Sequence, residues 1–167
     1  MSKTAKIFLI SAMGANKDFI ESCIASRYKL INRGRKYTVD NAYGVIQKER
    51  PDVIVIDHII PLFSDSHDKL ICDISNVENY SPELVFTYCI PKEEEKNEWI
   101  QQMFEKVYCA GVNYVFNIRN LCDDEFRDKL RCIIENDGKG ILMDIDEAIL
   151  KKWKDELKEK WGGDDLI

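Results

Sequence analysis

Residues 51–61 read PDVIVIDHIIP, and this stretch decides the fold class. Its four central residues, 53–56, are all apolar and β-branched, and the run ends at Asp57. Such a run is typical of a strand covered on both faces, as in a parallel sheet flanked by helices. In open α/β sheets the functional groups lie at the carboxyl ends of the strands. The stretch therefore predicts an α/β domain with Asp57 at the functional edge of its sheet.

The rest of the chain alternates between strand-like and helix-like segments. Apolar runs predict strands at residues 7–10, 36–39, 53–56, 84–89 and 112–116. Apolar residues at helical spacing predict helices at residues 19–24, 42–49, 64–79, 99–107 and 126–134. Five β/α units with short links predict a doubly wound, five-stranded parallel sheet.

The pattern changes after Gly138 and Gly140, so we divide the chain into residues 1–138 and an extension, residues 139–167. The extension carries five apolar residues spaced four apart, which predict an amphipathic helix: Ile145, Ile149, Trp153, Leu157 and Trp161. Exposed in water, this stripe would form an apolar patch that soluble monomers avoid. We expect it to pack on its own domain or on a partner helix, including that of a second copy in a homodimer.

Composition excludes several functional classes. The 167 residues carry a net charge of −6, and no basic stripe has interleaved aromatic residues, which argues against direct binding of nucleic acid. No apolar run is long enough to span a membrane, and the start lacks the architecture of a signal peptide, so we expect a cytoplasmic protein without membrane contact. Six scattered cysteines lack C-x-x-C spacing, which favours buried, reduced thiols over a zinc site or disulfides.

Catalytic signatures are missing from the sequence. It contains no G-x-S-x-G, P-loop, H-E-x-x-H or G-x-G-x-x-G motif, so neither an enzyme nor a cofactor is predicted. Two histidines, His58 and His67, flank the loop after Asp57; surface or packing roles are expected for them before a role as base or metal ligand. Residues 123–125 (DDE) are expected to begin a helix and to complement its dipole.

Several short motifs occur in the order typical of response-regulator receiver domains, the CheY-like family. Residues 57–61, DHIIP, resemble the family's phosphoacceptor aspartate and the proline that follows it. Thr87 lies where receivers place a Thr or Ser that hydrogen-bonds the phosphoryl group. Residues 110–115, AGVNYV, resemble the turn into strand five, with Tyr114 where an aromatic rotamer reports the state of that Thr. The resemblance covers residues 5–136 and implies a flavodoxin-like sheet of strand order 2-1-3-4-5.

The departures from the family concern its chemistry. Receivers hold magnesium with two adjacent acidic residues after strand one, whereas Ser11 and Ala12 occupy the matching positions. Asn117 replaces the lysine that ends strand five, and Ile118 replaces the proline after it. The metal and lysine neutralise charge during phosphoryl transfer, and losing one such contact typically costs about 10²–10³ in rate. We therefore expect a degenerate member, a pseudo-receiver, with no metal site.

The resulting hypothesis is an atypical receiver-like protein of two-component or phosphorelay signalling that acts by binding a sensor kinase or regulatory protein. In this hypothesis Asp57 is a strand-end carboxylate that is hydrogen-bonded to backbone amides or to Thr87. One alternative is a single-domain receiver that is phosphorylated on Asp57 by an unusual route. A second is a small α/β nucleotide-binding protein or enzyme that uses the same crevice, with residues 13–16 (MGAN) as a faint phosphate loop.

Overall fold

A computed structural model gives the fold of this protein. It describes residues 5–11, 14–25, 27–32, 35, 37–58, 65–91, 93–94, 97–98, 101–102, 105, 114–119, 122–135, 142–143 and 147–161. The strands within these residues are β1 (Lys6–Ser11), β2 (Lys29–Leu30), β3 (Val53–His58), β4 (Glu83–Tyr88), β5 (Tyr114–Asn117) and β6 (Leu142–Met143). The helices are α1 (Gly14–Ala25), α2 (Tyr43–Glu49), α3 (Asp65–Ser75), α5 (Asp123–Glu135) and α6 (Glu147–Trp161). The helix predicted at residues 99–107 lies largely outside the described residues.

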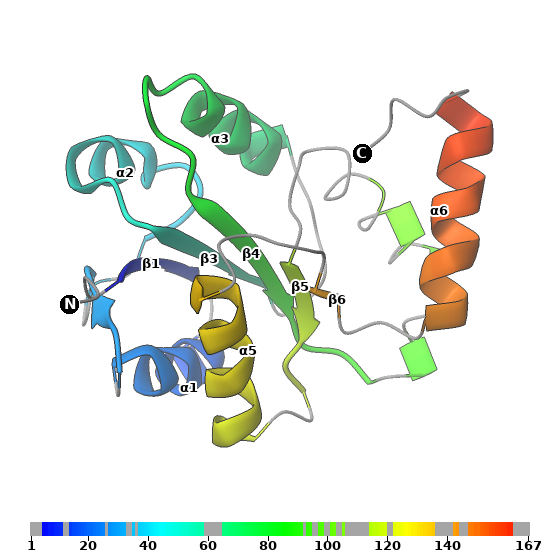
Figure 1. The fold of residues 1–167 in the computed structure, drawn as a ribbon, viewed down its shortest axis with the longest axis horizontal. Coiled ribbons are helices and arrows are strands. Elements are labelled where there is room, and N and C mark those ends of the chain that lie inside the picture. Colours follow the sequence, from blue (N-terminus) through cyan, green and yellow to red (C-terminus); the bar gives the residue numbers. More distant parts are fainter. Residues whose placement is uncertain are drawn as a thin grey trace.

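All strand pairs of the sheet are parallel, and the strand order is β2-β1-β3-β4-β5-β6. The predicted order 2-1-3-4-5 is therefore confirmed, and the short strand β6 is added at one edge. In Figure 1, α1 and α5 lie on one side of the sheet and α2 and α3 on the other. The protein is thus a doubly wound α/β fold of the flavodoxin-like type, as its sequence predicted.

The stretch that decided the fold is buried on both sides. Val53 and Val55 pack in the cluster that includes residues of α1 and α5. Ile54 and Ile56 pack in the opposite cluster, which includes residues of α2 and α3. Each of the four is at most 2% exposed, and burying one such side chain stabilises the fold by about 1.5–3 kcal/mol. A strand with one face exposed to solvent would bury only every second side chain and could not gain this stabilisation from all four residues. Burial on both faces therefore explains the unbroken apolar run.

The second strand was predicted at the wrong place. β2 is Lys29–Leu30, and Tyr37 to Val39 lie in an irregular segment instead of a strand. Backbone pairing with β1 ends here because the side chain of Asn32 bonds the β1 backbone in place of a strand partner. Its amide nitrogen donates to Leu9 O at 2.7 Å, and its Oδ1 accepts from Leu9 N–H at 3.1 Å. Tyr37 packs edge-on against Phe8 with ring centroids 5.2 Å apart. Its apolar character therefore reflects packing and not a strand.

The C-terminal extension contributes to the main sheet and core. Strand β6 pairs with β5, and Trp153 of α6 is 3% exposed within the α2/α3-side cluster. Gln101 also hydrogen-bonds Glu156 of α6. In Figure 1, α6 lies at the far end of the molecule, beyond β5 and β6. The expectation that the stripe packs on its own domain is confirmed for Trp153; the side chains of its other members lie outside the described residues.

Cysteine burial differs from the prediction. Of the described cysteines, all free thiols, only Cys23 is buried. Cys72 and Cys122 are exposed because they lie on the solvent side of α3 and just before α5, although their neighbours in sequence are apolar. Among the described residues, no helix is long and apolar enough to span a bilayer.

Candidate functional site at the carboxyl edge of the sheet

Asp57 lies at the centre of the candidate site. Its side chain is 1% exposed and accepts hydrogen bonds from side chains on both neighbouring strands. The Thr87 hydroxyl donates to Oδ1 at 2.6 Å, and the Ser11 hydroxyl donates to Oδ2 at 3.1 Å. Both donors are at most 2% exposed. Burying a carboxylate is costly unless donors compensate it, and these two hydroxyls supply part of that compensation.

Strand register brings these three residues together. Ser11 of β1 pairs with Asp57 of β3, and Asp57 pairs with Thr87 of β4. Because the three strands are parallel neighbours, they end at the same edge, and residues at equal height project to the same face. The sequence placed Asp57 and Thr87 at this edge and identified Ser11 as the replacement of a metal-binding acid. It did not predict that Ser11 would bond Asp57.

Asn117 lies at the same edge, and its side chain hydrogen-bonds nearby backbone groups. It pairs with Tyr88 of β4, and its side-chain amide donates to Ile90 O at 2.9 Å. Its Oδ1 accepts from Ile90 N–H at 3.3 Å and from Arg119 N–H at 3.2 Å. The side chain at the lysine position thus fastens the segment after β4 to the segment after β5, and it supplies no positive charge.

Tyr114 does not reach the site in this structure. It opens β5 opposite Val85, and its ring is 3% exposed in the α1/α5-side cluster. Burial, followed by the nearby Glu83 carboxylate, raises the pKa of Tyr114 to about 12. Glu83 begins β4, whereas Thr87 lies toward its end. The hydroxyl of Tyr114 is therefore beside the opposite edge of the sheet from Asp57.

The remaining residues singled out from the sequence lie as follows. Ala12 and the side chain of His58 lie outside the described residues. His67 is 3% exposed on α3, and its ring lies tilted against the Phe86 ring with the centroids 6.3 Å apart. This geometry agrees with the packing role expected for His67.

Two further residues at this edge were not predicted as part of the site, Cys89 and Arg119. Burial raises the pKa of the Cys89 thiol, the Arg119 guanidinium opposes this, and the Asp57 carboxylate adds to it. Both charges therefore act on the same thiol, which follows β4. Arg119 is exposed and follows Asn117 by two residues. Sequence spacing alone could have suggested it, as a cation just beyond the lysine position.

The described donors around Asp57 are one carboxylate and two hydroxyls, without a second acid. A protein site for Mg²⁺ usually offers one or two carboxylates together with substrate oxygens, in near-octahedral geometry. Here Ser11 brings a hydroxyl that donates to Asp57 where receivers bring a carboxylate. Across the described ranges, no group of three or more His, Cys, Asp or Glu side chains is placed to hold a metal ion. The arrangement can hold a buried carboxylate in place.

No family model and no curated protein matches this chain. Solved structures do match it. A response regulator protein from Burkholderia multivorans aligns with a TM-score of 0.50 and 11% identity, over 79% of this chain and 96% of that protein. A cobalamin-binding protein from Desulfitobacterium hafniense DCB-2 aligns with a TM-score of 0.50 and 16% identity, over 77% of this chain and 58% of that protein.

At these identities the likeness concerns the fold. The chain has the fold of response-regulator receiver domains, and nearly the whole of the Burkholderia protein is matched. A cobalamin-binding protein shares the same flavodoxin-like architecture. Fold alone does not choose between signalling and ligand binding, because one scaffold supports many functions. The choice has to come from the residues at the carboxyl edge.

Proposed function

We propose that this protein is a receiver-like regulatory protein that acts by binding another protein, without magnesium-dependent phosphorylation of Asp57. The observation that carries the proposal is that two neutral hydroxyls donate hydrogen bonds to the Asp57 carboxylate, from Thr87 at 2.6 Å and from Ser11 at 3.1 Å. These bonds stabilise the carboxylate within the protein itself. The receiver fold, the strand-end aspartate and the threonine remain, and the groups that would drive phosphoryl transfer are replaced.

Electrostatics supports the loss of phosphorylation. Attack by Asp57 on a phosphoryl group brings two negative charges together, and preorganised cations normally lower that barrier. Asn117, at the lysine position, is a neutral amide that holds the backbone of Ile90. A serine in place of one acid and a neutral amide in place of the lysine remove two of the stabilising contacts. Each typically contributes about 10²–10³ in rate, so transfer to Asp57 would be severely slowed.

Intact-mass spectrometry tests this proposal. The full chain is incubated with acetyl phosphate and magnesium, beside a phosphorylatable response regulator as positive control. We expect no added phosphoryl group on this chain under conditions that modify the control. Detection of the adduct in the wild type and its loss in Asp57→Asn would contradict the proposal and favour the alternative of an unusual single-domain receiver.

The partner in this proposal is a sensor kinase or another regulatory protein. Binding that does not depend on phosphate should be insensitive to Asp57→Asn, which keeps the size and acceptor oxygen of the side chain. A partner captured by the wild type, then purified, should bind both forms with the same Kd in calorimetry. A partner that binds only a phosphorylated wild type would overturn the phosphate-independent mode. Self-association through α6 belongs to the same proposal, and sedimentation velocity measures it.

A further inference from the structure

Two turns at the amino edge of the sheet contact each other through their side chains. The first, residues 50–52, joins α2 to β3, and the second, residues 76–82, joins α3 to β4. Because β3 and β4 are neighbours and Val53 pairs with Glu83, the two turns lie side by side. Asp57 and Thr87 lie toward the other end of the same strands. The contact between the turns is therefore separate from the carboxyl-edge site.

Left-handed backbone conformations occur in both turns. Arg50 has φ 48° and ψ 61°, and Asn79 has φ 56°. Arg50 caps α2, where its N–H donates to Ile46 O at 2.8 Å. Helices commonly end on a left-handed residue, but that residue is usually glycine or asparagine, because a Cβ makes the conformation costly. Asn79 tolerates it, whereas Arg50 requires a compensating interaction.

The Arg50 side chain makes such an interaction by reaching the second turn. Its guanidinium donates to Glu78 O, 28 positions along the chain, and its Cζ lies 5.3 Å from the centroid of the Tyr80 ring. The Tyr80 hydroxyl in return donates to Pro51 O at 2.6 Å. Each turn therefore gives a hydrogen bond to the backbone of the other, with a cation–π contact between them. We call these four residues, Arg50, Pro51, Glu78 and Tyr80, the latch.

The first turn is also fixed to the sheet at its far end. Asp52 N–H donates to Lys6 O at 2.8 Å, and Asp52 O accepts from Glu83 N–H at 3.0 Å. The Asp52 carboxylate accepts from Lys6 N–H at 2.8 Å. The neighbouring strands thus hold Asp52, and the latch holds the two residues before it.

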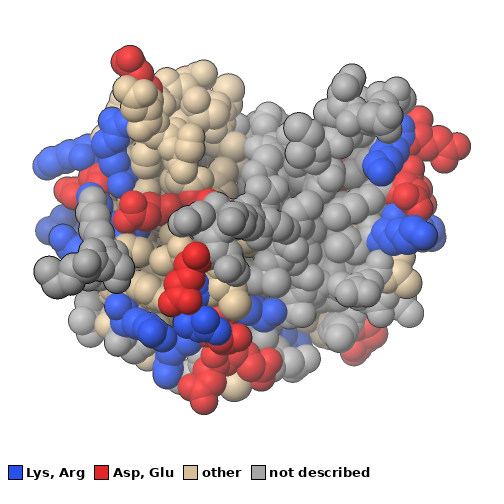
Figure 2. Space-filling view, viewed as in Figure 1, with Lys and Arg blue, Asp and Glu red and all other residues tan. Residues whose placement is uncertain are grey.

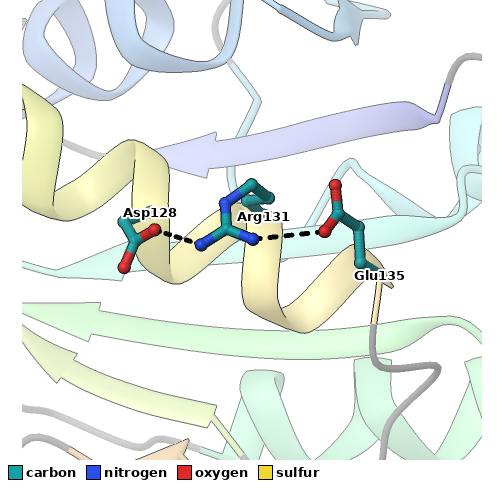
Figure 3. A network of polar contacts seen from close by, with 3 residues as sticks. All are labelled: Asp128, Arg131 and Glu135. Atoms are coloured by element: carbon teal, nitrogen blue, oxygen red, sulfur yellow. Dashed lines mark hydrogen bonds and ion pairs between the residues drawn. The ribbon is translucent and has the colours of Figure 1, made fainter.

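Arg50 differs in its reach from an arginine that pairs within its own helix. Arg131 of α5 bonds Asp128 and Glu135, three and four positions away (Figure 3). In Figure 2, blue and red side chains adjoin one another over the lower part of the face shown, where Figure 1 places α1 and α5. Such exposed pairs contribute little to stability, and pairs within one helix connect no separate elements. Arg131 is therefore a matched control for Arg50.

We propose that the latch couples the end of α2 to the end of α3, so that the two turns open together and not one by one. The competing explanation is packing alone, since Ile46 of α2 and Ile74 of α3 belong to one core cluster. The latch differs from this packing because its contacts are directional and offset the strain at Arg50. Arg50 is exposed and Tyr80 is partly exposed, so the coupling acts in local opening of the native state, below global unfolding.

Native-state hydrogen exchange on the full ¹⁵N-labelled chain tests this inference. The reporters are the amides of Arg50 and Val77, which donate to Ile46 O and Ile74 O at the ends of α2 and α3. Arg50→Met keeps the stem without the guanidinium and should speed exchange at Val77. Tyr80→Phe keeps the ring without the hydroxyl and should speed exchange at residue 50. We expect about fivefold in each case, the net effect of one hydrogen bond.

The control and the double variant decide between the latch and packing. Arg131→Met removes a guanidinium with local partners, so exchange at residues 50 and 77 should stay unchanged. Arg50→Met combined with Tyr80→Phe should speed exchange by less than the product of the two single effects, because both act on one coupled unit. If each single variant speeds exchange only in its own turn, or in neither, the latch is overturned.

Arg50→Gly and Arg50→Ala separate the strain from the contact. Both remove the guanidinium, but only glycine adopts the left-handed conformation without cost. We expect the alanine variant to unfold at a lower urea concentration than the glycine variant. Equal midpoints for the two would overturn the offset of strain by the side chain. The inference does not rest on the function proposed for Asp57, and an acyl phosphate on Asp57 would leave these results standing.

Discussion

The hydroxyl of Thr87 donates a 2.6 Å hydrogen bond to Oδ1 of Asp57 across two neighbouring strands, with both side chains at most 1% exposed. In receivers, the threonine at this position hydrogen-bonds a phosphoryl group, as the resemblance implies. Here its described bond is to the carboxylate itself. This hydrogen bond holds the Asp57 carboxylate and the Thr87 hydroxyl together, and it provides a direct way to test the site.

Removing the Thr87 hydroxyl should destabilise the fold. Thr87→Val keeps the shape of the side chain but takes a donor from a buried carboxylate, and such a loss typically costs about 1–3 kcal/mol. We expect the free energy of unfolding, measured by urea denaturation, to fall by that amount. Thr87→Ser keeps a hydroxyl and should lose markedly less. Equal stability of the valine and serine variants would show that the hydrogen bond contributes little.

Ser11→Asp should make stability depend on magnesium. The wild-type hydroxyl donates to Asp57 Oδ2 at 3.1 Å, so the new carboxylate would face a buried carboxylate. Like charges at that distance should lower stability by about 1–3 kcal/mol without a divalent cation. Magnesium should recover much of the loss by binding both acids in the folded state.

The measurement is the Tm of the Ser11→Asp variant with and without millimolar magnesium. Ser11→Asn is the control, since it changes size similarly without adding charge, and its Tm should not respond to magnesium. The wild type should not respond either. A magnesium shift of equal size in all three proteins would mean that the ion binds elsewhere.

Trp153→Ala should strongly destabilise the protein because the indole is 3% exposed in the core cluster of the α2/α3 side. Replacing a buried tryptophan by alanine typically costs about 3–5 kcal/mol. Lys151→Ala, an exposed change on the same helix, should stay within about 0.5 kcal/mol of the wild type. Thermal unfolding compares them, and light scattering on folded samples shows whether either change alters the mass. If Trp153→Ala left stability unchanged, the packing of α6 against the core would contribute little to the fold.

Tyr114 should contribute to a loss of stability at alkaline pH. Its pKa is raised from 10.0 in the unfolded chain to about 12 in the folded protein. Between these values the unfolded state has released the proton that the folded state still holds, so stability falls as pH rises through this window. Below about pH 10 the contribution is fully present.

Tyr114→Phe isolates that contribution. Urea denaturation at neutral pH and at increasing alkaline pH should show a smaller alkaline loss for the variant than for the wild type. The loss will not vanish, because burial also raises the pKa of Tyr80. Identical alkaline slopes for the two proteins would show that Tyr114 titrates normally.

The sequence located the elements whose signal is local and strong. Residues 53–56 form an apolar run that is typical of a doubly covered strand, and the structure shows both faces buried. Short strands carry no such signal. A two-residue strand has neither period nor length, so Lys29–Leu30 and Leu142–Met143 were not predicted, and an apolar segment at residues 36–39 was mistaken for a strand.

Within the site, the sequence identified which residues meet at the edge but not what they bond. Strand ends and their order placed Asp57, Thr87 and Asn117 at one edge, since parallel strands end together. The bond from Ser11 to Asp57 spans 46 positions, and the bonds from Asn117 to Ile90 span 27. Such contacts depend on register and side-chain direction, which are tertiary quantities. Tyr114 illustrates the limit, because its hydroxyl lies near Glu83 and away from Thr87.

The sequence by itself determined the fold class, because that depends on residue type and local periodicity, and its resemblance to receiver domains implied the order of the first five strands and the replacement of the acidic pair and the lysine. Tertiary structure alone decided that Ser11 and Thr87 compensate the buried charge of Asp57 and that Asn117 holds the backbone. The physical reason is that burial and hydrogen bonding depend on distances between residues far apart in the chain, which only packing fixes.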